Sequence, residues 1–255
     1  MVVIAWEEII NNKQNKCAVI VAAGQGTRLK PLTDTTPKCL LKVNGIPIIK
    51  YQLDNLVSSG INNLAIVTGY KGFMIKNYID NSQYSSKINV TYIHNEDYKK
   101  TGSCYSLYLC KDYLSGRGYI HINSDLIFHK DFLNILINSK EDNCVITDKP
   151  LIKNFDMVRF ECNEKGRINK VGRPDYLPNP NGYLIGPIKF SNEAKNYFIQ
   201  KIESRLNEGI LDDTCFLLLN GILDKIMLYS KYSNNKKWFE IDTKNDLAFA
   251  KANLA

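Results

Sequence analysis

The chain has 255 residues, of which 44% are hydrophobic and 23% are charged, and its formal net charge at pH 7 is +7. This composition excludes a disordered or fibrous protein and is sufficient for one large α/β domain, or for a core domain with an elaborated half. The basic residues are spread along the chain without interleaved aromatic residues. We therefore expect no nucleic-acid binding and only a mild preference for anionic ligands.

Seven cysteines are present, and none belongs to a C-x-x-C pair or to a Cys/His cluster. This usage predicts buried free thiols in a reducing compartment, and hence a cytoplasmic protein. No apolar run approaches the roughly 18 residues of a membrane span. Residues 1–16 lack the basic start and cleavage site of a secretory signal. We expect this N-terminal extension to pack on the domain or on a second subunit, which keeps a homodimer among the possible states.

Strands and helices alternate in the first half of the chain. Cys17–Ala23 is an apolar run typical of a parallel strand covered on both faces. A helix is predicted after Pro47, and Gly60 comes where its left-handed cap belongs. Further strands are predicted over Leu64–Thr68, Ile88–His94 and Gly118–Asn123, and further helices around Ile75–Ile79 and over Ser106–Leu114. This order predicts an open α/β sheet with right-handed crossovers.

The second half predicts a less regular arrangement that is richer in strands. Asp156–Cys162 and Arg167–Gly172 flank turn residues and are expected to form a hairpin. Two more strands are predicted over Gly182–Phe190 and Trp238–Ile241, and Ser191 and Thr243 are placed to cap the helices that follow these strands.

A glycine-rich turn follows the first predicted strand. Residues 24–27 (Gly-Gln-Gly-Thr) offer backbone N–H groups to a ligand at a point where side chains do not block access, which suits phosphate oxygens. Arg28 and Lys38 bring two positive charges to the same edge. The turn has neither the Gly-Lys-Ser/Thr of the Walker A loop nor the third glycine of the dinucleotide fingerprint. The segment therefore predicts a phosphate site of another type.

Two aspartates follow predicted strands at the edge where ligands bind in open α/β sheets. Asp125 comes after a strand that ends at Asn123, and Asp242 comes after the last predicted strand. A helix cap or turn is the ordinary explanation of each residue when it is considered alone. Because the phosphate turn is predicted at the same edge, both favour a site for a hard divalent cation, Mg²⁺.

This set of charges suits one type of reaction. An anionic phosphate oxygen attacks the α-phosphate of a nucleotide and pyrophosphate leaves, so the site must offset the repulsion between two anions. No acid–base residue is required, because a phosphate dianion is already deprotonated at neutral pH. His94, His121 and His129 are accordingly predicted to be structural.

The segment from Gly24 to Lys38 resembles the signature G-x-G-T-R-L-x-P-L-T-x-x-x-P-K of sugar-phosphate-type nucleotidyltransferases, with every defining position filled. Further segments are similar to the phosphocholine cytidylyltransferase branch, which includes aminoethylphosphonate and phosphoglutamine cytidylyltransferases; these segments are Ser106–Leu109, Asp156–Gly172, Gly182–Gly186 and Trp238–Leu247. The resemblance runs from about Cys17 to Leu254. It implies a Rossmann-like, doubly wound, mostly parallel mixed sheet of the GT-A-like type. We expect one domain over residues 17–255, with 17–130 mainly binding nucleotide and 131–255 forming a smaller, β-rich, acceptor-binding half.

The resemblance also implies roles for particular residues. Arg28 and Lys38 are expected to be catalytic and to contact the triphosphate of CTP, and Asp125 and Asp242 to hold Mg²⁺. The residues expected to bind the nucleotide are Ala22, Ala23, Gly24, Gln25, Gly26, Thr27, Arg28, Lys38, Gly102, Ser103, Ser106 and Asn123.

Acceptor contacts are predicted at four residues. Asp148 and Lys149 end a strand at the expected acceptor side, where Lys149 is placed to meet a phosphate. Tyr183 and Asp213 are candidates for a cationic amine, through ring face and charge respectively. A core strand position explains Tyr183 equally well.

These inferences predict a CTP-dependent cytidylyltransferase. It would transfer CMP to the phosphate or phosphonate of a small amine or amino acid, for bacterial capsule or surface polysaccharide decoration. Phosphocholine enzymes tend to carry an Asn pair before Tyr-Ser-Leu, where this chain has Ser103-Cys104, so the acceptor stays open.

Two alternatives remain. A hexose-1-phosphate nucleotidyltransferase using UTP, dTTP or GTP would usually carry an E-K-P segment, which Thr147–Pro150 matches in part. A regulatory subunit would bind nucleotide without catalysis.

Overall fold

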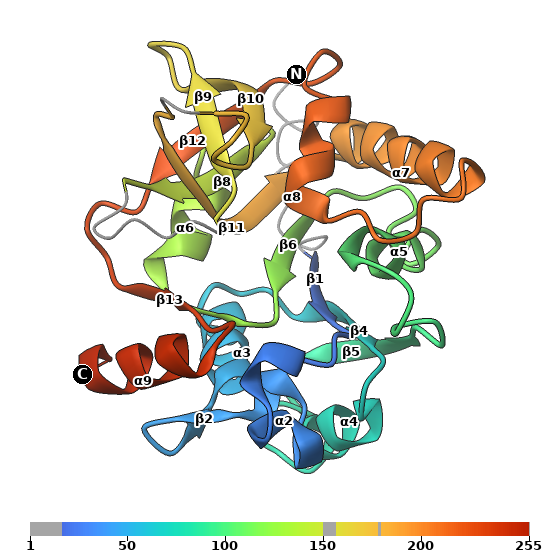
Figure 1. Ribbon diagram of the computed structural model, residues 1–255, viewed down its shortest axis with the longest axis vertical. Helices are drawn as coiled ribbons and strands as arrows, with labels where there is room; N and C mark the ends of the chain where they lie inside the picture. The colour runs from blue at the N-terminus through green and yellow to red at the C-terminus, as the bar shows by residue number, and fades with distance from the viewer. Residues whose placement is uncertain (1–16, 150–156, 178–179, 255) are drawn as a thin grey trace, which may run out of the picture.

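The computed structural model describes residues 17–149, 157–177 and 180–254. Among these residues, a nine-stranded mixed sheet crosses the molecule in the order β5-β4-β1-β6-β11-β8-β12-β10-β9 (Figure 1). The predicted N-terminal extension, residues 1–16, and the predicted strand start at Asp156 lie outside the described ranges.

The elements have the following bounds. The strands of the large sheet are β1 (Cys17–Ala22), β4 (Asn63–Thr68), β5 (Asn89–His94), β6 (Tyr119–Asn123), β8 (Cys144–Asp148), β9 (Arg159–Cys162), β10 (Arg167–Gly172), β11 (Gly182–Phe190) and β12 (Leu228–Tyr232). Two small sheets pair β2 (Lys42–Val43) with β3 (Ile46–Pro47) and β7 (Leu126–Phe128) with β13 (Trp238–Glu240). The α-helices are α2 (Leu32–Thr35), α3 (Ile48–Ser58), α4 (Gly72–Asp80), α5 (Ser103–Tyr108), α6 (Asp131–Ile137), α7 (Asn192–Asn207), α8 (Cys215–Leu218) and α9 (Lys244–Asn253). The 3₁₀ helices are η1 (Thr27–Leu29), η2 (Lys38–Leu40) and η3 (Leu219–Gly221).

The four strands β5-β4-β1-β6 are parallel, as the alternating pattern of the first half predicted. Successive residues of β1 point to opposite faces of the sheet. Val19 belongs to the core cluster that contains Phe198 of α7, whereas Ile20 belongs to the cluster that contains Leu53 of α3. Apolar cores therefore cover both faces of β1, which explains its continuous apolar sequence.

The second half makes the sheet mixed. Strand β11 runs antiparallel to both β6 and β8, and β10 runs antiparallel to β12 and β9. The predicted α/β class and the mixed sheet are therefore confirmed, whereas antiparallel pairs make up more of the sheet than a mostly parallel, doubly wound arrangement implies. For β9 and β10 the reason is local, because the predicted hairpin turn joins them, Gly166 in that turn has a φ of +76°, and a hairpin can only pair strands antiparallel.

Most predicted helix boundaries are confirmed. Helix α3 begins after Pro47, and Gly60 has a φ of +70° just past the helix end. The Ser191 hydroxyl accepts a hydrogen bond from the N–H of Ala194, and Thr243 forms a reciprocal capping box at the start of α9.

The helix predicted over Ser106–Leu114 is displaced. Helix α5 begins at Ser103 and ends at Tyr108, and turns follow it. The earlier start reflects long-range contacts, because the N–H of Cys104 donates to the carbonyl of Asp213. Local helical periodicity does not contain that information.

All seven cysteines are free thiols, and six of them are buried, as predicted. No helix among the described residues is long and apolar enough to cross a membrane. The predicted cytoplasmic location stays a prediction.

His121 lies fully inside the core on β6. Its ring makes edge contacts with Tyr119 and Phe216, and its Nε2 lies 3.0 Å from the side-chain oxygen of Asn123. Burial lowers the pKa of His121 to about 4, against smaller opposing effects of Asn123 and Asp125. The folded protein therefore holds this ring neutral, as a structural histidine would be.

We expect His121 to make stability depend on pH. Its folded-state pKa lies below the unfolded value of about 6.5, so its contribution is present above that pH and is lost as the pH falls towards 4. From this group alone, the free energy of unfolding should be roughly 2 kcal/mol lower at pH 5 than at pH 7. Chemical denaturation of the wild type and of His121→Gln at both pH values measures the difference. An equal pH dependence in the two proteins would contradict the assignment.

Candidate active site

A cavity of roughly 930 Å³ lies at the carboxyl ends of β1 and β6. This is the edge at which the sequence placed the phosphate turn and the first aspartate. The predicted nucleotide and metal residues that line the cavity are Ala22, Ala23, Gly24, Gly26, Thr27, Arg28, Lys38, Gly102, Ser103, Ser106, Asn123, Asp125 and Asp242. Gln25 is the one predicted nucleotide residue that is not among the residues lining it. The sheet edge therefore brings together residues from both halves of the chain.

The glycine turn is shaped by Gly26. This residue has a φ of +62°, in the left-handed region that favours glycine. A Cβ atom at Gly26 would lie 3.1 Å from the Thr33 methyl carbon and 3.2 Å from the Cβ of Lys38. The Thr33 hydroxyl also donates to the carbonyl of Gly26 at 2.9 Å. The turn and the start of η2 thus pack directly on each other, and this packing fixes where Lys38 begins.

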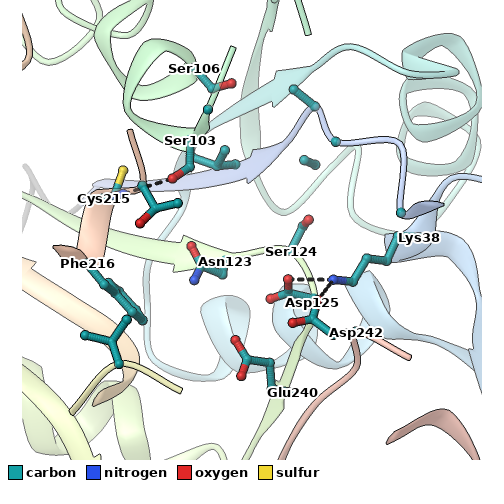
Figure 2. Close-up of a pocket in the computed structure, with 18 of the residues that line it drawn as sticks. Lys38, Ser103, Ser106, Asn123, Ser124, Asp125, Cys215, Phe216, Glu240 and Asp242 are labelled. Carbon is teal, nitrogen blue, oxygen red and sulfur yellow. Dashed lines mark hydrogen bonds and ion pairs between the residues drawn. The ribbon is translucent and has the colours of Figure 1, made fainter. Parts of the chain in front are cut away.

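The ammonium group of Lys38 lies between two carboxylates (Figure 2). Its Nζ donates to Asp125 Oδ2 at 2.8 Å and also to Asp242 Oδ1. Arg28 forms an ion pair with the other oxygen of Asp242, with Nη2 and Oδ2 2.8 Å apart. The Lys38 side chain is 14% exposed and that of Arg28 is 53% exposed, so Lys38 acts from the floor of the site and Arg28 from its rim.

The β7–β13 ladder brings the two aspartates together. Glu240 pairs with Leu126, and the N–H of Ile241 donates to the carbonyl of Asp125 at 3.0 Å. Residues that are far apart in the sequence therefore leave the ladder side by side. The capping box of α9 begins at the next residue and fixes the backbone that follows Asp242.

These charges stabilise one another. Burial alone would lower the pKa of Lys38, but attraction to Asp125 and Asp242 and the hydrogen bonds to them outweigh burial and raise the pKa to about 12. Burial works to raise the pKa of Asp242, but Lys38 and Arg28 hold it below its usual value. Lys38 and Asp242 therefore remain charged at neutral pH.

Glu240 is a third carboxyl group on the cavity wall, and the sequence analysis missed it. Burial raises its pKa, the negative charges of Asp125 and Asp242 add to this effect, and the pKa reaches about 8. Burial and the neighbouring aspartates therefore favour the neutral form of Glu240.

One oxygen of Asp125 fits a hard cation. Asp125 Oδ1 is buried and has no hydrogen-bond partner within the part of the chain that the structure describes. An orphaned carboxylate oxygen beside a second carboxylate is satisfied by Mg²⁺, which prefers oxygen ligands. The described residues contain no group of three or more His, Cys, Asp or Glu able to hold a metal. Two carboxylates suit Mg²⁺, which completes its shell with water and phosphate oxygens.

Buried hydrogen bonds organise the other end of the cavity. Asn95 is fully buried, and its side-chain nitrogen donates to the hydroxyls of Thr101 and Ser106, at 3.0 Å each. The Ser103 hydroxyl accepts from the N–H of Cys215 at 2.9 Å (Figure 2). Residues 101–106 thus form a fixed wall opposite the charged cluster.

The four predicted acceptor residues do not line the cavity, and each has other neighbours. Asp148 accepts a hydrogen bond from the Trp238 indole at 2.8 Å, and Lys149 is exposed. Tyr183 is a buried strand residue with the guanidinium of Arg159 over its ring. Asp213 forms an ion pair with Arg205 on α7. A position at a strand end does not specify which way a side chain points, and the role of these four residues towards the acceptor stays a prediction.

The part of the cavity away from the charged cluster is also lined by residues to which the sequence analysis assigned no role. Arg173 and Asp175 follow β10, Phe216 lies on α8, and Met157 and Leu184 add apolar surface. One sequence signal could have indicated Arg173: Arg173-Pro174 directly follows a predicted strand and is a second partial match to the E-K-P segment of hexose-1-phosphate nucleotidyltransferases. Lys149-Pro150 matches E-K-P more fully, because it carries the lysine.

Comparison with known proteins identifies the family. The nucleotidyl transferase family matches residues 17–186 of the chain. The chain belongs to this family. It is 28% identical over 261 residues to the CTP:phosphoglutamine cytidylyltransferase of Campylobacter jejuni, covering 90% of this chain and 97% of the relative. It is 34% identical over 240 residues to the choline-phosphate cytidylyltransferase of Haemophilus influenzae, covering 90% and 93%.

A solved structure shows the same fold. The CTP:phosphocholine cytidylyltransferase of Streptococcus pneumoniae matches with a TM-score of 0.76 at 22% identity, over 94% of this chain and 100% of that chain. The resemblance seen in the sequence is therefore confirmed, and the protein is a nucleotidyltransferase.

We expect Gly26→Ala to impair catalysis beyond the effect of placing alanine at a positive φ. Gly45 also has a positive φ, of +82°, but a Cβ there meets nothing within 4 Å, so Gly45→Ala is a matched control. Both variants should lose roughly 1–2 kcal/mol of stability because alanine is disfavoured in the left-handed region, and Gly26→Ala should lose more because its Cβ also meets Thr33 and Lys38. Only Gly26→Ala displaces Lys38, so its nucleotidyl transfer should slow at least about tenfold. Thermal unfolding and steady-state pyrophosphate release test this, and equal activity of the two variants would contradict the proposed packing.

Proposed function

We propose that the protein is a cytidylyltransferase that transfers CMP from CTP to the phosphate or phosphonate of a small amine or amino acid. The observation that carries this proposal is the meeting of Arg28, Lys38, Asp125 and Asp242 at one end of a cavity large enough for two substrates. Two relatives matched over nearly their whole length are named CTP:phosphoglutamine and choline-phosphate cytidylyltransferases, which supports the choice of nucleotide and acceptor class.

The transfer is an in-line displacement at phosphorus. An oxygen of the acceptor phosphate forms a bond to the α-phosphorus of CTP while the bond from that phosphorus to the bridging oxygen breaks. Pyrophosphate leaves with the bonding electron pair, and no proton needs to move because the acceptor is already an anion. The cationic Lys38 and Arg28 offset the repulsion between the two anions and the charge that develops on the leaving group.

Asp125 and Asp242 would hold Mg²⁺ at this point. When bound, the ion would offset negative charge on the phosphates and orient them for displacement. The unpartnered Oδ1 of Asp125 supports this assignment. Lys38 contacts both carboxylates and so holds them at a fixed separation.

We assign the two remaining regions of the cavity by their chemistry. The cytosine ring lies against the wall formed by residues 101–106, whose backbone and hydroxyl groups offer polar contacts. The acceptor phosphate lies towards Arg173, and its cationic amine towards Asp175 and the ring of Phe216. This assignment replaces Asp148, Lys149, Tyr183 and Asp213. A role in capsule or surface polysaccharide decoration, a cytoplasmic location, the absence of nucleic-acid binding and a homodimer stay predictions.

A substrate matrix tests the proposal. Pyrophosphate release by the wild-type protein is measured with Mg²⁺, one nucleotide and one acceptor. The nucleotides are CTP, UTP, dTTP and GTP, and the acceptors are phosphocholine, aminoethylphosphonate, glutamine phosphate and glucose-1-phosphate. We expect kcat/KM for CTP with a small phospho-amine to exceed that for any nucleotide with glucose-1-phosphate by at least about a hundredfold. Faster turnover of glucose-1-phosphate would establish the hexose alternative. Nucleotide binding without pyrophosphate release would establish the regulatory alternative.

Asp125→Asn tests the metal assignment. The substitution keeps the shape of the side chain but removes its charge, so the Mg²⁺ concentration for half-maximal activity should rise at least about tenfold. Asp148→Asn is the control, because Asp148 also lies at a strand end but accepts a hydrogen bond from the Trp238 indole outside the cavity. A magnesium titration compares the two variants, and identical curves would remove Asp125 from the metal site. The same control should leave the KM for the acceptor unchanged.

A further inference from the structure

The wall of the nucleotide end is held from behind by a segment of the second half of the chain. The N–H of Gly102 donates to the carbonyl of Leu211 at 2.7 Å, and the N–H of Cys104 donates to the carbonyl of Asp213 at 3.1 Å. The Ser103 hydroxyl accepts from the N–H of Cys215 at 2.9 Å. Three consecutive residues of the wall are therefore bonded to residues 211–215, which we call the clamp segment.

The contact between the wall and the clamp segment leaves no spare space. A Cβ atom at Gly102 would lie 2.3 Å from the carbonyl oxygen of Asp213 and 2.5 Å from that of Asp212. The φ of Gly102 is −85°, so the glycine is required by this close approach and not by its backbone conformation. Any movement of the clamp segment consequently moves Gly102 or breaks its hydrogen bond.

The position of the clamp segment is set by the end of α7. Gly209, with a φ of +80°, reverses the chain after the helix, and the N–H of Ile210 donates back to the carbonyl of Arg205. The guanidinium of Arg205 then reaches the returning segment, with Nε 2.7 Å from Asp213 Oδ2 and Nη2 3.4 Å from Oδ1. A two-pronged ion pair therefore ties the helix end to the clamp segment. Figure 1 shows α7 and α8 beside α5 at this point.

We propose that Asp213 is a positioning residue for the nucleotide, acting through its ion pair with Arg205 to hold the clamp segment against residues 102–104. The inference rests on the proposed function only in taking residues 101–106 as the nucleotide wall. It assigns Asp213 an effect on nucleotide binding and none on acceptor binding. Asp213 itself does not line the cavity, so its effect is indirect.

The test compares Asp213→Asn, Arg205→Gln and the double variant with Glu141→Gln. Glu141 and Lys231 form an ion pair of similar exposure elsewhere in the second half, with side chains 32% and 25% exposed against 24% and 29% for Asp213 and Arg205. Calorimetry measures the Kd of CTP with Mg²⁺, and steady-state kinetics measure kcat and the acceptor KM. Hydrogen exchange of the peptide containing residues 102–104 reports the clamp directly, without any substrate.

We expect each single variant of the Arg205–Asp213 pair to raise the Kd of CTP about tenfold, with kcat and the acceptor KM within about threefold of wild type. The double variant should be no worse than the weaker-binding single variant, because both substitutions break the same contact. Exchange at residues 102–104 should accelerate in all three variants. Glu141→Gln should leave the Kd and this exchange unchanged.

Four results would overturn the proposal. An unchanged Kd in both single variants would show that the pair has no effect on the nucleotide, and a raised acceptor KM alone would return Asp213 to the acceptor. Additive single effects would show two independent roles.

If Asp213→Asn fails to fold, Arg205→Gln carries the test from the helix side. If the wild-type protein binds UTP in place of CTP, the proposed choice of nucleotide is wrong, but the effect of the clamp segment can still be tested with UTP. If the wild-type protein binds no nucleoside triphosphate, both proposals are wrong.

Discussion

The bridge made by the Lys38 ammonium between Asp125 and Asp242 is the constraint on which the rest of the site depends. Two carboxylates that contact the same ammonium group lie close enough to repel each other, and each has lost part of its hydration. They can therefore remain ionised together only beside a cation. Lys38 supplies that charge from the start of η2, which packs on the glycine turn, and the β7–β13 ladder and the α9 cap supply the geometry. The neighbouring Glu240 shows the alternative outcome, because burial and its neighbours push that group towards its neutral form.

The sequence predicted the charged cluster because the information is local. Gly26 and Asp125 each lie within a few residues of a strand end, and parallel strands carry their ends to one edge of the sheet; Lys38, at the start of η2, was predicted from its position in the segment from Gly24 to Lys38. Asp242 also follows a short strand, but β13 belongs to a separate two-stranded sheet, and its antiparallel pairing with β7 brings Asp242 to Asp125. The parallel strands were predictable for a similar reason, since a strand covered on both faces is continuously apolar.

The acceptor end was not predictable because its residues are selected by long-range pairing. Asp148 and Trp238 come from distant segments, as do Asp213 and the wall residue Cys104 that bonds its carbonyl. The start of α5 shows the same limitation, since a contact with the clamp segment determines it. Neither the direction of β11 nor the role of Arg173 after β10 follows from the periodicity of the sequence around it.

The reversed direction of β11 has a consequence for how this family can diversify. Because β11 runs against β6, its beginning, near Leu184, faces the cavity together with the stretch that follows β10. On the assignment proposed above, the nucleotide would meet the carboxyl ends of parallel strands, and the acceptor would meet the core residue Leu184 and the connecting stretch that follows β10. Such stretches tolerate substitution and changes of length better than core strands do. Evolution can therefore exchange the second substrate while the phosphorus chemistry is inherited unaltered.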